Sequence, residues 1–281
     1  MRLKFAATAL VATALLVSGC GGPASPAPSV PVVPPASTGA EPSRSPEPSA
    51  TPSLAPVHEG FVALSDVDPS ILQDMRYATP HNFVGRPVAG YKQPRCLVTR
   101  QAAEALRSVQ QKAVAKGYSL KVYDCYRPQQ AVDDFVSWSH DSDQRMKGEF
   151  YPHVDKSRLF ADGYIGGPTA HSRGSTLDLT IVALPPRTQP GFDPAQPLLP
   201  CTAPSGQRFA DNTVDMGTGF DCFDPLAHTA ADGVSPAQRD NRELLTGLMS
   251  AGGFTNYPKE WWHYTLQNEP FPDTYFNFPV A

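Results

Sequence analysis

The sequence of 281 residues contains no run of 18 or more apolar residues, which argues against an integral membrane protein. It also lacks an excess of positive charge, because 23 Lys and Arg stand against 27 Asp and Glu, a net charge of −4. A general nucleic-acid-binding protein needs a basic surface to contact phosphates, so this class is excluded. Only 18% of the residues are charged, and the chain has no glycine-rich phosphate loop and no internal repeat.

The first 20 residues have the form of a bacterial export signal that ends in a lipid-attachment site. Arg2 and Lys4 provide a positive start, and the apolar stretch Phe5–Val17 is too short for a mature transmembrane helix. The sequence VSGC, which ends at Cys20, resembles the lipobox, in which the cysteine thiol is acylated. We therefore predict a lipoprotein signal peptide over residues 1–19 and lipidation of Cys20. The alternative is a plain secretory signal in which Cys20 has no role.

Proline is concentrated directly after this signal. Residues 21–57 contain 11 of the 31 prolines and no aromatic residue. Such a segment buries too little apolar surface to offset the entropy of ordering, so residues 20–58 are predicted to form a disordered, lipid-anchored linker rich in Pro, Ser and Ala. The folded domain is then expected over residues 59–281, outside the cytoplasm and tethered to a bacterial membrane.

Four cysteines remain in the folded domain: Cys96, Cys125, Cys201 and Cys222. Export places them in an oxidising compartment, and their even number favours disulfides. No pair has Cys-x-x-Cys spacing, so a zinc–thiolate site is not indicated. Of the three possible connectivities we expect Cys96–Cys125 and Cys201–Cys222, which close the shortest loops. A free catalytic cysteine is the alternative, but Cys125 has no neighbouring histidine in the sequence to activate it.

Local patterns predict three helices and three strands in this domain. The helices are expected at residues 99–117, 128–140 and 235–251, and the strands at residues 118–126, 177–183 and 261–267. Thr99 and Ser235 are suitable N-cap residues, and Gly117 is a suitable helix stop. Because these elements do not alternate as regular βαβ units, we expect the α+β class, a compact single domain with a central antiparallel sheet flanked by helices.

Two short motifs carry side chains suited to metal-dependent hydrolysis. In HSRGSTLD, His171 precedes Asp178 by seven positions, and Gly174 between them allows a turn. In EWWHY, Glu260 precedes His263 by three positions. Two imidazoles and one carboxylate form a three-ligand zinc site with the fourth position open for water. A nearby carboxylate that is not a ligand can accept a proton from this water, and Glu260 is placed for that role.

Spacing alone leaves an ordinary structural interpretation open. On a regular strand, residues three positions apart point to opposite faces of the sheet. Glu260 and His263 can therefore meet one metal ion only if the chain turns or bulges near Trp261. Without such a turn, His263 is a buried core residue and Glu260 a surface residue.

The segments HSRGSTLDLT, EWWHY and YDCYRP resemble, in order and relative spacing, the signature blocks of the zinc D-alanyl-D-alanine dipeptidases, the family that includes the vancomycin-resistance dipeptidase. The similarity extends over nearly all of residues 60–281. It implies the same α+β fold and one zinc ion per chain, bound by His171, Asp178 and His263. It also implies that Glu260 is the general base, and later the general acid, of peptide hydrolysis.

The resemblance further implies how the substrate is held. Arg127 matches the arginine that stabilises the oxyanion of the tetrahedral intermediate, a role that a permanently charged guanidinium suits. Asp221 matches the aspartate that pairs with the substrate ammonium. Other substrate contacts are implied for the aromatic residues Tyr77, Phe135 and Trp261 and for the hydroxyl of Thr169. For the three aromatic residues, a place in the hydrophobic core is the alternative.

The predicted function is zinc-dependent hydrolysis of D-Ala-D-Ala, or of related small D,D-dipeptides, outside the cytoplasm and in cell-wall peptide turnover. The proline-rich segment of residues 184–210 is longer than in compact relatives, and we expect it to alter the mouth of the pocket. A D,D-carboxypeptidase or L,D-endopeptidase acting on longer wall peptides is one alternative, and a non-catalytic zinc-dependent binding module is another. The expected partners are a small dipeptide and a membrane, with no nucleic acid; no oligomeric state is predicted.

Overall fold

The computed structural model describes residues 57–281. The predicted signal peptide, the lipidation site Cys20 and all but the last two residues of the predicted linker lie outside this part. Within residues 57–281, no helix combines the length and the apolar character that crossing a membrane requires.

The described part contains a five-stranded sheet, a two-stranded sheet and five α-helices, with four short 3₁₀ helices between them. The strands are β1 (Phe61–Ala63), β2 (Leu72–Gln73), β3 (Leu97–Thr99), β4 (Tyr118–Asp124), β5 (Thr176–Ala183), β6 (Phe254–Asn256) and β7 (His263–Leu266). The α-helices are α1 (Leu64–Val67), α2 (Arg100–Val114), α3 (Gln129–His140), α4 (Lys147–Phe150) and α5 (Pro236–Ser250). The 3₁₀ helices are η1 (Arg76–Ala78), η2 (Lys156–Arg158), η3 (Ala170–Arg173) and η4 (Pro225–Ala227).

The larger sheet has the strand order β2-β4-β5-β7-β6, and the smaller sheet pairs β1 with β3. All neighbours in the larger sheet are antiparallel except β2 and β4, which are parallel. The α+β class with a central, mainly antiparallel sheet is thus confirmed. The parallel edge was not predicted, because β2 has only two residues and shows no periodicity.

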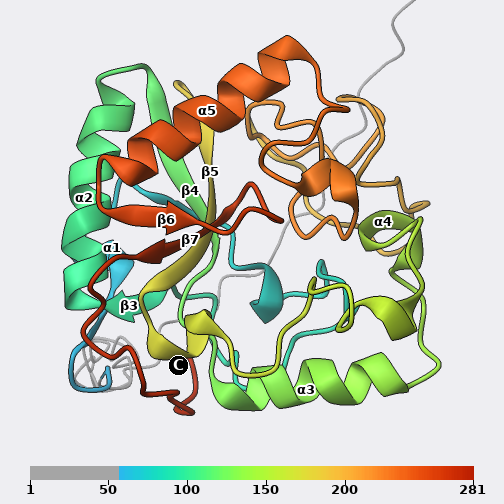
Figure 1. Cartoon of the computed structure of the whole chain (residues 1–281), viewed down its shortest axis with the longest axis horizontal. Helices are drawn as coiled ribbons and strands as arrows, with labels where there is room; N and C mark the ends of the chain where they lie inside the picture. Colours follow the sequence, from blue (N-terminus) through green and yellow to red (C-terminus); the bar gives the residue numbers. More distant parts are fainter. Residues whose placement is uncertain (1–56) are drawn as a thin grey trace, which may run out of the picture. The chain divides into compact units, whose positions relative to one another are not determined.

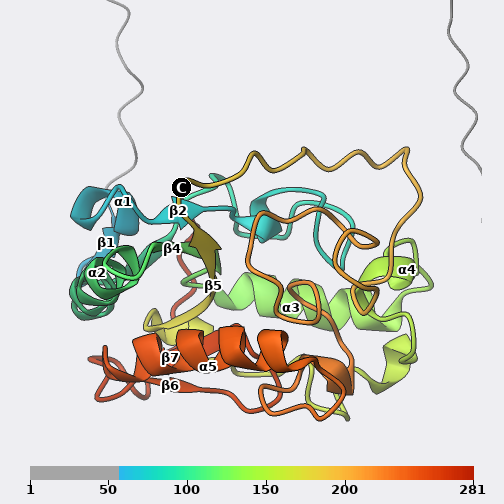
Figure 2. The same cartoon turned by 90° about the horizontal axis from the view of Figure 1, so that it is seen from above.

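Strand alternation separates the two faces of this sheet. Leu177, Leu179 and Ile181 of β5 belong to a core that also contains the apolar stripe of α2 and the buried side of α5. The helices α2 and α5 contact each other and the sheet. Figure 1 shows α3 well apart from both, and Figure 2 again shows α3 apart from α2. Asp178 and Thr180, between the apolar positions of β5, point to the opposite face. That face is therefore the one available for polar chemistry.

The predicted helix caps are present. The Thr99 hydroxyl accepts a hydrogen bond from the amide of Ala102 at the start of α2. At the start of α5, Ser235 and Gln238 form a reciprocal capping box. The third predicted helix, α3, begins one residue after Pro128, which is its N-cap.

Two predicted strands are shorter than expected because the chain leaves the sheet early. A bulge between Val122 and Asp124 ends β4 at Asp124 rather than Tyr126. Strand β7 begins at His263 rather than Trp261, since the residues before it form a turn. Both departures occur at the same end of the sheet, beside the polar residues described below.

Both expected disulfides, Cys96–Cys125 and Cys201–Cys222, are formed in the structure. A second hydrophobic core lies around α3, with Phe135 and Trp138 from the helix, Tyr77 from η1, and Phe83 and Phe223 from loops. The two cores leave a polar site between the sheet and the second core.

Candidate active site

Three polar residues form a row across the sheet. Asp178 on β5 is paired in register with Asp124 on β4 and with His263 on β7. Neighbouring strands lie about 4.8 Å apart, so residues in register bring their side chains together when they share a face. Asp124 and Asp178 are almost completely buried, and His263 is half-buried.

His171 reaches this row from the loop that precedes β5. It lies in η3, where the hydroxyl of Thr169 accepts a hydrogen bond from the His171 amide. Gly174 ends this turn with φ of +83°, and a Cβ there would lie 2.2 Å from the ring of Phe61. Glycine is therefore required for the chain to turn back into β5. The expected turn between His171 and Asp178 is present.

The side chains of His171, Asp178 and His263 converge on one point. Nε2 of His171 lies 3.3 Å from Oδ1 of Asp178 and 3.2 Å from Nδ1 of His263, and this Nδ1 lies 3.2 Å from the same Oδ1. Ligand atoms of a tetrahedral zinc ion, each at about 2.0–2.1 Å, are about 3.3–3.4 Å apart. The group therefore has the dimensions of a three-ligand metal site.

The surroundings of Asp178 also fit a metal ion. Its buried Oδ1 makes no hydrogen bond within residues 57–281, although two imidazole nitrogens face it. Burial alone raises the pKa of Asp178, but His171 and His263 outweigh this effect and hold the pKa below its ordinary value. Burial lowers the pKa of His263, which favours the neutral imidazole that binds metal. A buried oxygen that accepts no hydrogen bond and lies between two imidazole nitrogens suits a cation.

A main-chain contact sets the orientation of His171. Its Nδ1 lies 2.8 Å from the carbonyl oxygen of Cys125 and donates a hydrogen bond to it, which leaves the Nε2 lone pair facing Asp178. In return, the amide of Arg127 donates to the His171 carbonyl at 3.3 Å. The segment after β4 and the loop before β5 are thus held to each other at the site.

Glu260 is brought to the group by the turn that joins β6 to β7. The amide of Glu260 donates to the carbonyl of Tyr257, and the amide of His263 donates to that of Glu260. This is the turn that the spacing argument required, and it places Oε2 of Glu260 3.5 Å from Nδ1 of His263. Burial, and then the charge of Asp178, raise the pKa of Glu260 well above its ordinary value. A cation beside the carboxyl opposes this shift and favours the ionised form.

Arg127 lies over the same site and is held there by a buried carboxylate. Its guanidinium contacts Oδ2 of Asp124 at 2.8 Å and Oδ2 of Asp178 at 3.4 Å. The other oxygen of Asp124 accepts a 2.6 Å hydrogen bond from Tyr91. Asp124 was not among the predicted site residues, although it is the acid in YDCYRP. Its signal was an acidic residue at the end of a predicted strand, three positions before Arg127.

A cavity of about 270 Å³ opens over these residues, and Asp221 and Tyr77 line its wall. The Tyr77 hydroxyl donates a 2.8 Å hydrogen bond to Oδ2 of Asp221. Burial, and then the charge of Asp178, raise the pKa of Asp221 to about 8. A cationic group in the cavity would therefore be stabilised beside this carboxyl.

Most of the other predicted contacts also line the cavity, with one exception. Phe135 and Thr169 are part of its wall, together with the loop from Gly163 to Pro168. Trp261 is not: its indole is buried in the sheet–helix core, and Nε1 donates to the hydroxyl of Thr218 at 2.9 Å. The prediction that Trp261 lines the pocket is wrong, because the turn that points Glu260 toward the cavity points Trp261 away from it.

Comparison with known proteins identifies the family. Residues 57–185 and 207–281 match the model of the D-Ala-D-Ala dipeptidases. The chain is 38% identical over 226 residues to a D-alanyl-D-alanine dipeptidase of Enterococcus faecalis, covering 80% of this chain and 100% of that protein. It is 39% identical to one of Streptomyces coelicolor, over 79% of this chain and 98% of the relative. A third, from Escherichia coli, is 31% identical over 73% of this chain and 84% of its own length. The chain therefore belongs to the D-Ala-D-Ala dipeptidase family of metallopeptidases.

Proposed function

We propose that this chain is a lipid-anchored, extracytoplasmic zinc D,D-dipeptidase that hydrolyses D-Ala-D-Ala, or related small D,D-dipeptides, in cell-wall peptide turnover. The observation that carries the proposal is one cavity of about 270 Å³ that contains both the His171–Asp178–His263 group and the buried carboxyl of Asp221. A small peptide can contact both at once. The names of the relatives, D-alanyl-D-alanine dipeptidases, support this substrate class.

The hydrolytic step is assigned to Glu260 beside the three proposed ligands. When bound, zinc supplies a Lewis acid and lowers the pKa of its water to about 7. Glu260 lies at the edge of the group, 3.5 Å from His263, where its carboxylate can accept a proton from the attacking water. The same carboxyl, now protonated, then acts as the general acid and donates this proton to the leaving amine.

Arg127 is assigned to the oxyanion that forms at the scissile carbonyl. Its guanidinium carbon lies 5.0 Å from the centre of the Tyr77 ring and 5.3 Å from that of Phe135, so two aromatic faces and Asp124 fix its position. A cation held rigidly in a buried site stabilises developing negative charge without reorganisation. Arg127 lines the same cavity as Glu260.

Asp221 is assigned to the free amine of the substrate. The pKa of Asp221 is raised because its carboxylate is buried and lies near the negative charge of Asp178. A substrate ammonium provides a positive charge that stabilises the ionised carboxylate. Burial also raises the pKa of Tyr77 well above its ordinary value, so its hydroxyl stays protonated and donates to Asp221. An ammonium clamp of this kind rejects a peptide extended at its amino end.

The direct test is an assay of the purified protein on D-Ala-D-Ala and on a wall pentapeptide that ends in D-Ala-D-Ala. We expect hydrolysis of the dipeptide, little or none of the pentapeptide, and loss of activity on chelation that zinc restores. Preference for the pentapeptide would instead support a D,D-carboxypeptidase. Tight dipeptide binding without hydrolysis would support a binding module.

A further inference from the structure

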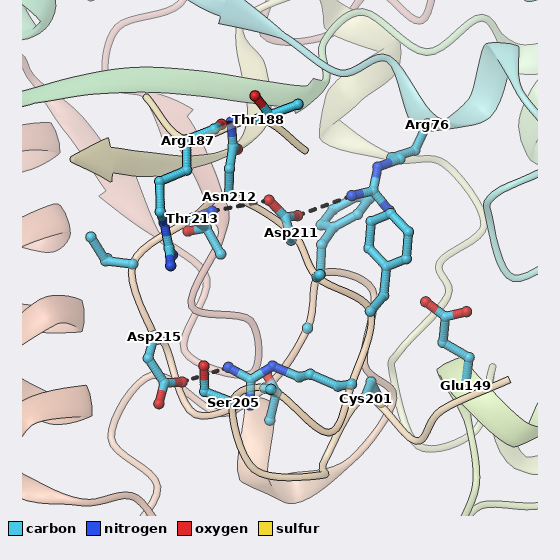
Figure 3. Close-up of a pocket in the computed structure, with 18 residues that line it drawn as sticks. Arg76, Glu149, Arg187, Thr188, Cys201, Ser205, Asp211, Asn212, Thr213 and Asp215 are labelled. Atoms are coloured by element: carbon cyan, nitrogen blue, oxygen red, sulfur yellow. Dashed lines mark hydrogen bonds and ion pairs between the residues drawn. The ribbon is translucent and has the colours of Figure 1, made fainter. Parts of the chain in front are cut away.

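Residues 186–206 are not matched by the family model, and we call this segment the insertion. A second cavity of about 320 Å³ opens beside it (Figure 3). Thr218, Gly219 and Phe220 line this second cavity, whereas the next residue, Asp221, lines the first. A single stretch of chain therefore separates the insertion side from the substrate side.

The insertion is joined to this stretch on both sides of Asp221. Cys201 forms a disulfide with Cys222, the residue directly after Asp221. The carbonyl of Cys201 accepts a 2.9 Å hydrogen bond from the amide of Gly219. The amide of Cys201 donates a 2.9 Å hydrogen bond to the carbonyl of Glu149. Cys201 thus links the loop that carries Asp221 to the body of the domain.

The backbone of Asp221 needs such support. Its φ is +55°, in the left-handed region that residues other than glycine adopt at a cost of about 1–3 kcal/mol when the surroundings impose it. The side chain has one hydrogen bond within the described residues, from Tyr77. A loop released from its anchors would therefore relax and move the carboxyl.

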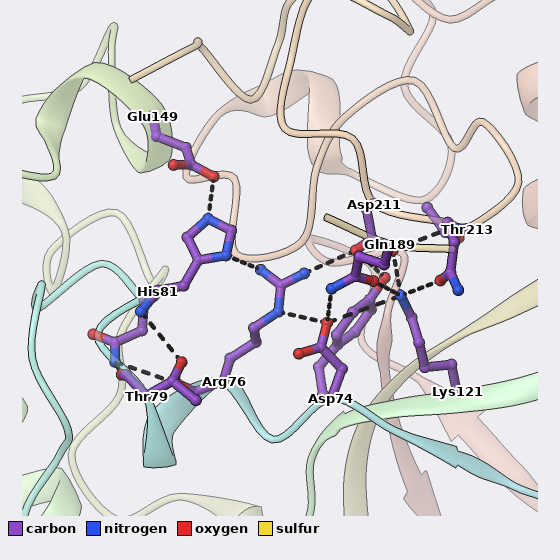
Figure 4. Close-up of polar contacts among 12 residues, drawn as sticks. Asp74, Arg76, Thr79, His81, Lys121, Glu149, Gln189, Asp211 and Thr213 are labelled. Carbon is purple, nitrogen blue, oxygen red and sulfur yellow. Dashed lines mark hydrogen bonds and ion pairs between the residues drawn. The ribbon is translucent and has the colours of Figure 1, made fainter. Parts of the chain in front are cut away.

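A second anchor of the insertion involves Arg76, the residue before Tyr77, and Figure 4 shows its polar contacts. Arg76 is buried and donates to Asp74 at 2.8 Å and to Asp211 at 2.9 Å. Gln189 of the insertion donates a 2.9 Å hydrogen bond to Oδ2 of Asp74, the oxygen that also accepts from Arg76. The Gln189 side chain in turn accepts a 2.9 Å hydrogen bond from Lys121. Lys121 in turn contacts Asp211. The insertion therefore completes the polar network that holds the Arg76 guanidinium.

Arg76 directly precedes Tyr77 in η1, so fixing Arg76 fixes the backbone that carries Tyr77. The insertion consequently supports both partners of one hydrogen bond, with Gln189 behind Tyr77 and Cys201 behind Asp221. No hydrogen bond or ion pair within residues 57–281 joins the insertion to the three proposed ligands.

We propose that the insertion is a positioning element for amine recognition. It holds Tyr77 and Asp221 in the geometry that binds the substrate ammonium, and it makes no hydrogen bond or ion pair with the proposed zinc ligands or with Glu260 within residues 57–281. This inference rests on the proposed function in one respect, the assignment of Asp221 to the substrate amine. The Cys201 anchor, which supports Asp221, is therefore expected to affect KM for the dipeptide much more than kcat.

The test removes the two anchors separately. We expect the double variant Cys201→Ser/Cys222→Ser to raise KM for D-Ala-D-Ala about tenfold or more, with kcat and zinc content within about twofold of wild type. Gln189→Ala, which keeps both disulfides, is expected to raise KM by a smaller factor. In an Asp221→Asn background, removing the disulfide should raise KM no further, because the two changes act through one interaction. An unchanged KM in both single-anchor variants, or an equal rise in the Asp221→Asn background, would overturn the proposal.

Hydrogen–deuterium exchange gives a readout that does not depend on activity. In the disulfide-free variant, amides of residues 217–223 should exchange faster than in wild type, whereas those of β5 should not change. Should the Cys variant fail to fold, the same comparison is made with Gln189→Ala for residues 74–79. Wild-type exchange in these loops would overturn the proposed positioning role. A wild-type enzyme that does not hydrolyse the dipeptide would refute the proposed function, while the exchange comparison still decides whether the insertion orders the loop.

Discussion

The imidazole of His171 is fixed by the main chain rather than by an acidic side chain. Its Nδ1 donates to the carbonyl of Cys125 at 2.8 Å, while Oδ2 of Asp124 lies farther away, at 3.4 Å. The carbonyl allows only one tautomer, with the lone pair on Nε2. The Cys96–Cys125 disulfide holds this carbonyl in the core, so each disulfide of the domain lies next to one half of the site.

Asp124 is expected to act by holding Arg127. In Asp124→Ala, the guanidinium loses its 2.8 Å ionic partner and keeps only the weaker 3.4 Å ion pair with Asp178, besides its contacts with the two aromatic rings. We predict that kcat falls roughly 100-fold because the oxyanion loses a pre-positioned cation, while zinc content stays near one per chain. Steady-state kinetics and metal analysis measure both quantities. Wild-type kcat in this variant would contradict the role assigned to Asp124.

For single residues, the sequence indicated the reacting groups but not the contacts that position them. His171, Asp178, Glu260 and His263 stand in two short motifs, and the structure brings them together. The hydrogen bond between Tyr77 and Asp221 joins residues 144 positions apart, and no local pattern indicates such a contact. Trp261 was misassigned because a motif gives the order of residues and not the direction of each side chain.

Among the secondary-structure elements, long and capped helices were predictable and short strands were not. The apolar residues Ala102, Leu106, Val109 and Ala113 recur at helical spacing along α2, and all four are fully buried. Strands of two or three residues, such as β2 and β6, are too short to show alternation. Their places in the sheet are decided by tertiary pairing, which also sets the Asp124–Asp178–His263 row.

The capping box of α5 provides a test at the level of one element. Ser235→Ala removes the side-chain oxygen that accepts from the amide of Gln238. We predict a loss of about 1 kcal/mol in the free energy of unfolding, measured by urea denaturation. Because α5 covers the face of the sheet opposite the active site, kcat and KM for the dipeptide should not change. A stability equal to wild type, or a lost activity, would contradict this separation of roles.

For the whole molecule, the two hydrophobic cores explain where the active site lies. One core joins the sheet to α2 and α5, and the other surrounds α3. The site residues come from the sheet, from η3 and from loops of the second core, so the cavity forms only when both cores are assembled. Neither the boundary between the cores nor the second cavity was predictable, since both depend on loops without periodic sequence.

The proposed membrane anchor depends on Cys20, outside the described residues. We predict that a bacterial host grown with radiolabelled palmitate labels the wild-type protein and does not label Cys20→Ala. The variant should be released from the membrane fraction, because the mature chain then has no acyl chains. Equal labelling of the two proteins would refute the lipid anchor and leave the catalytic assignment untouched.

The most direct test of the catalytic account compares zinc content and turnover in Glu260→Ala and His263→Ala. If Glu260 transfers protons and does not bind metal, Glu260→Ala retains one zinc per chain and loses D-Ala-D-Ala hydrolysis by a factor of about 100 or more. His263→Ala, which removes a proposed ligand, should lose both. Loss of zinc from Glu260→Ala, or turnover close to wild type in that variant, would contradict the account.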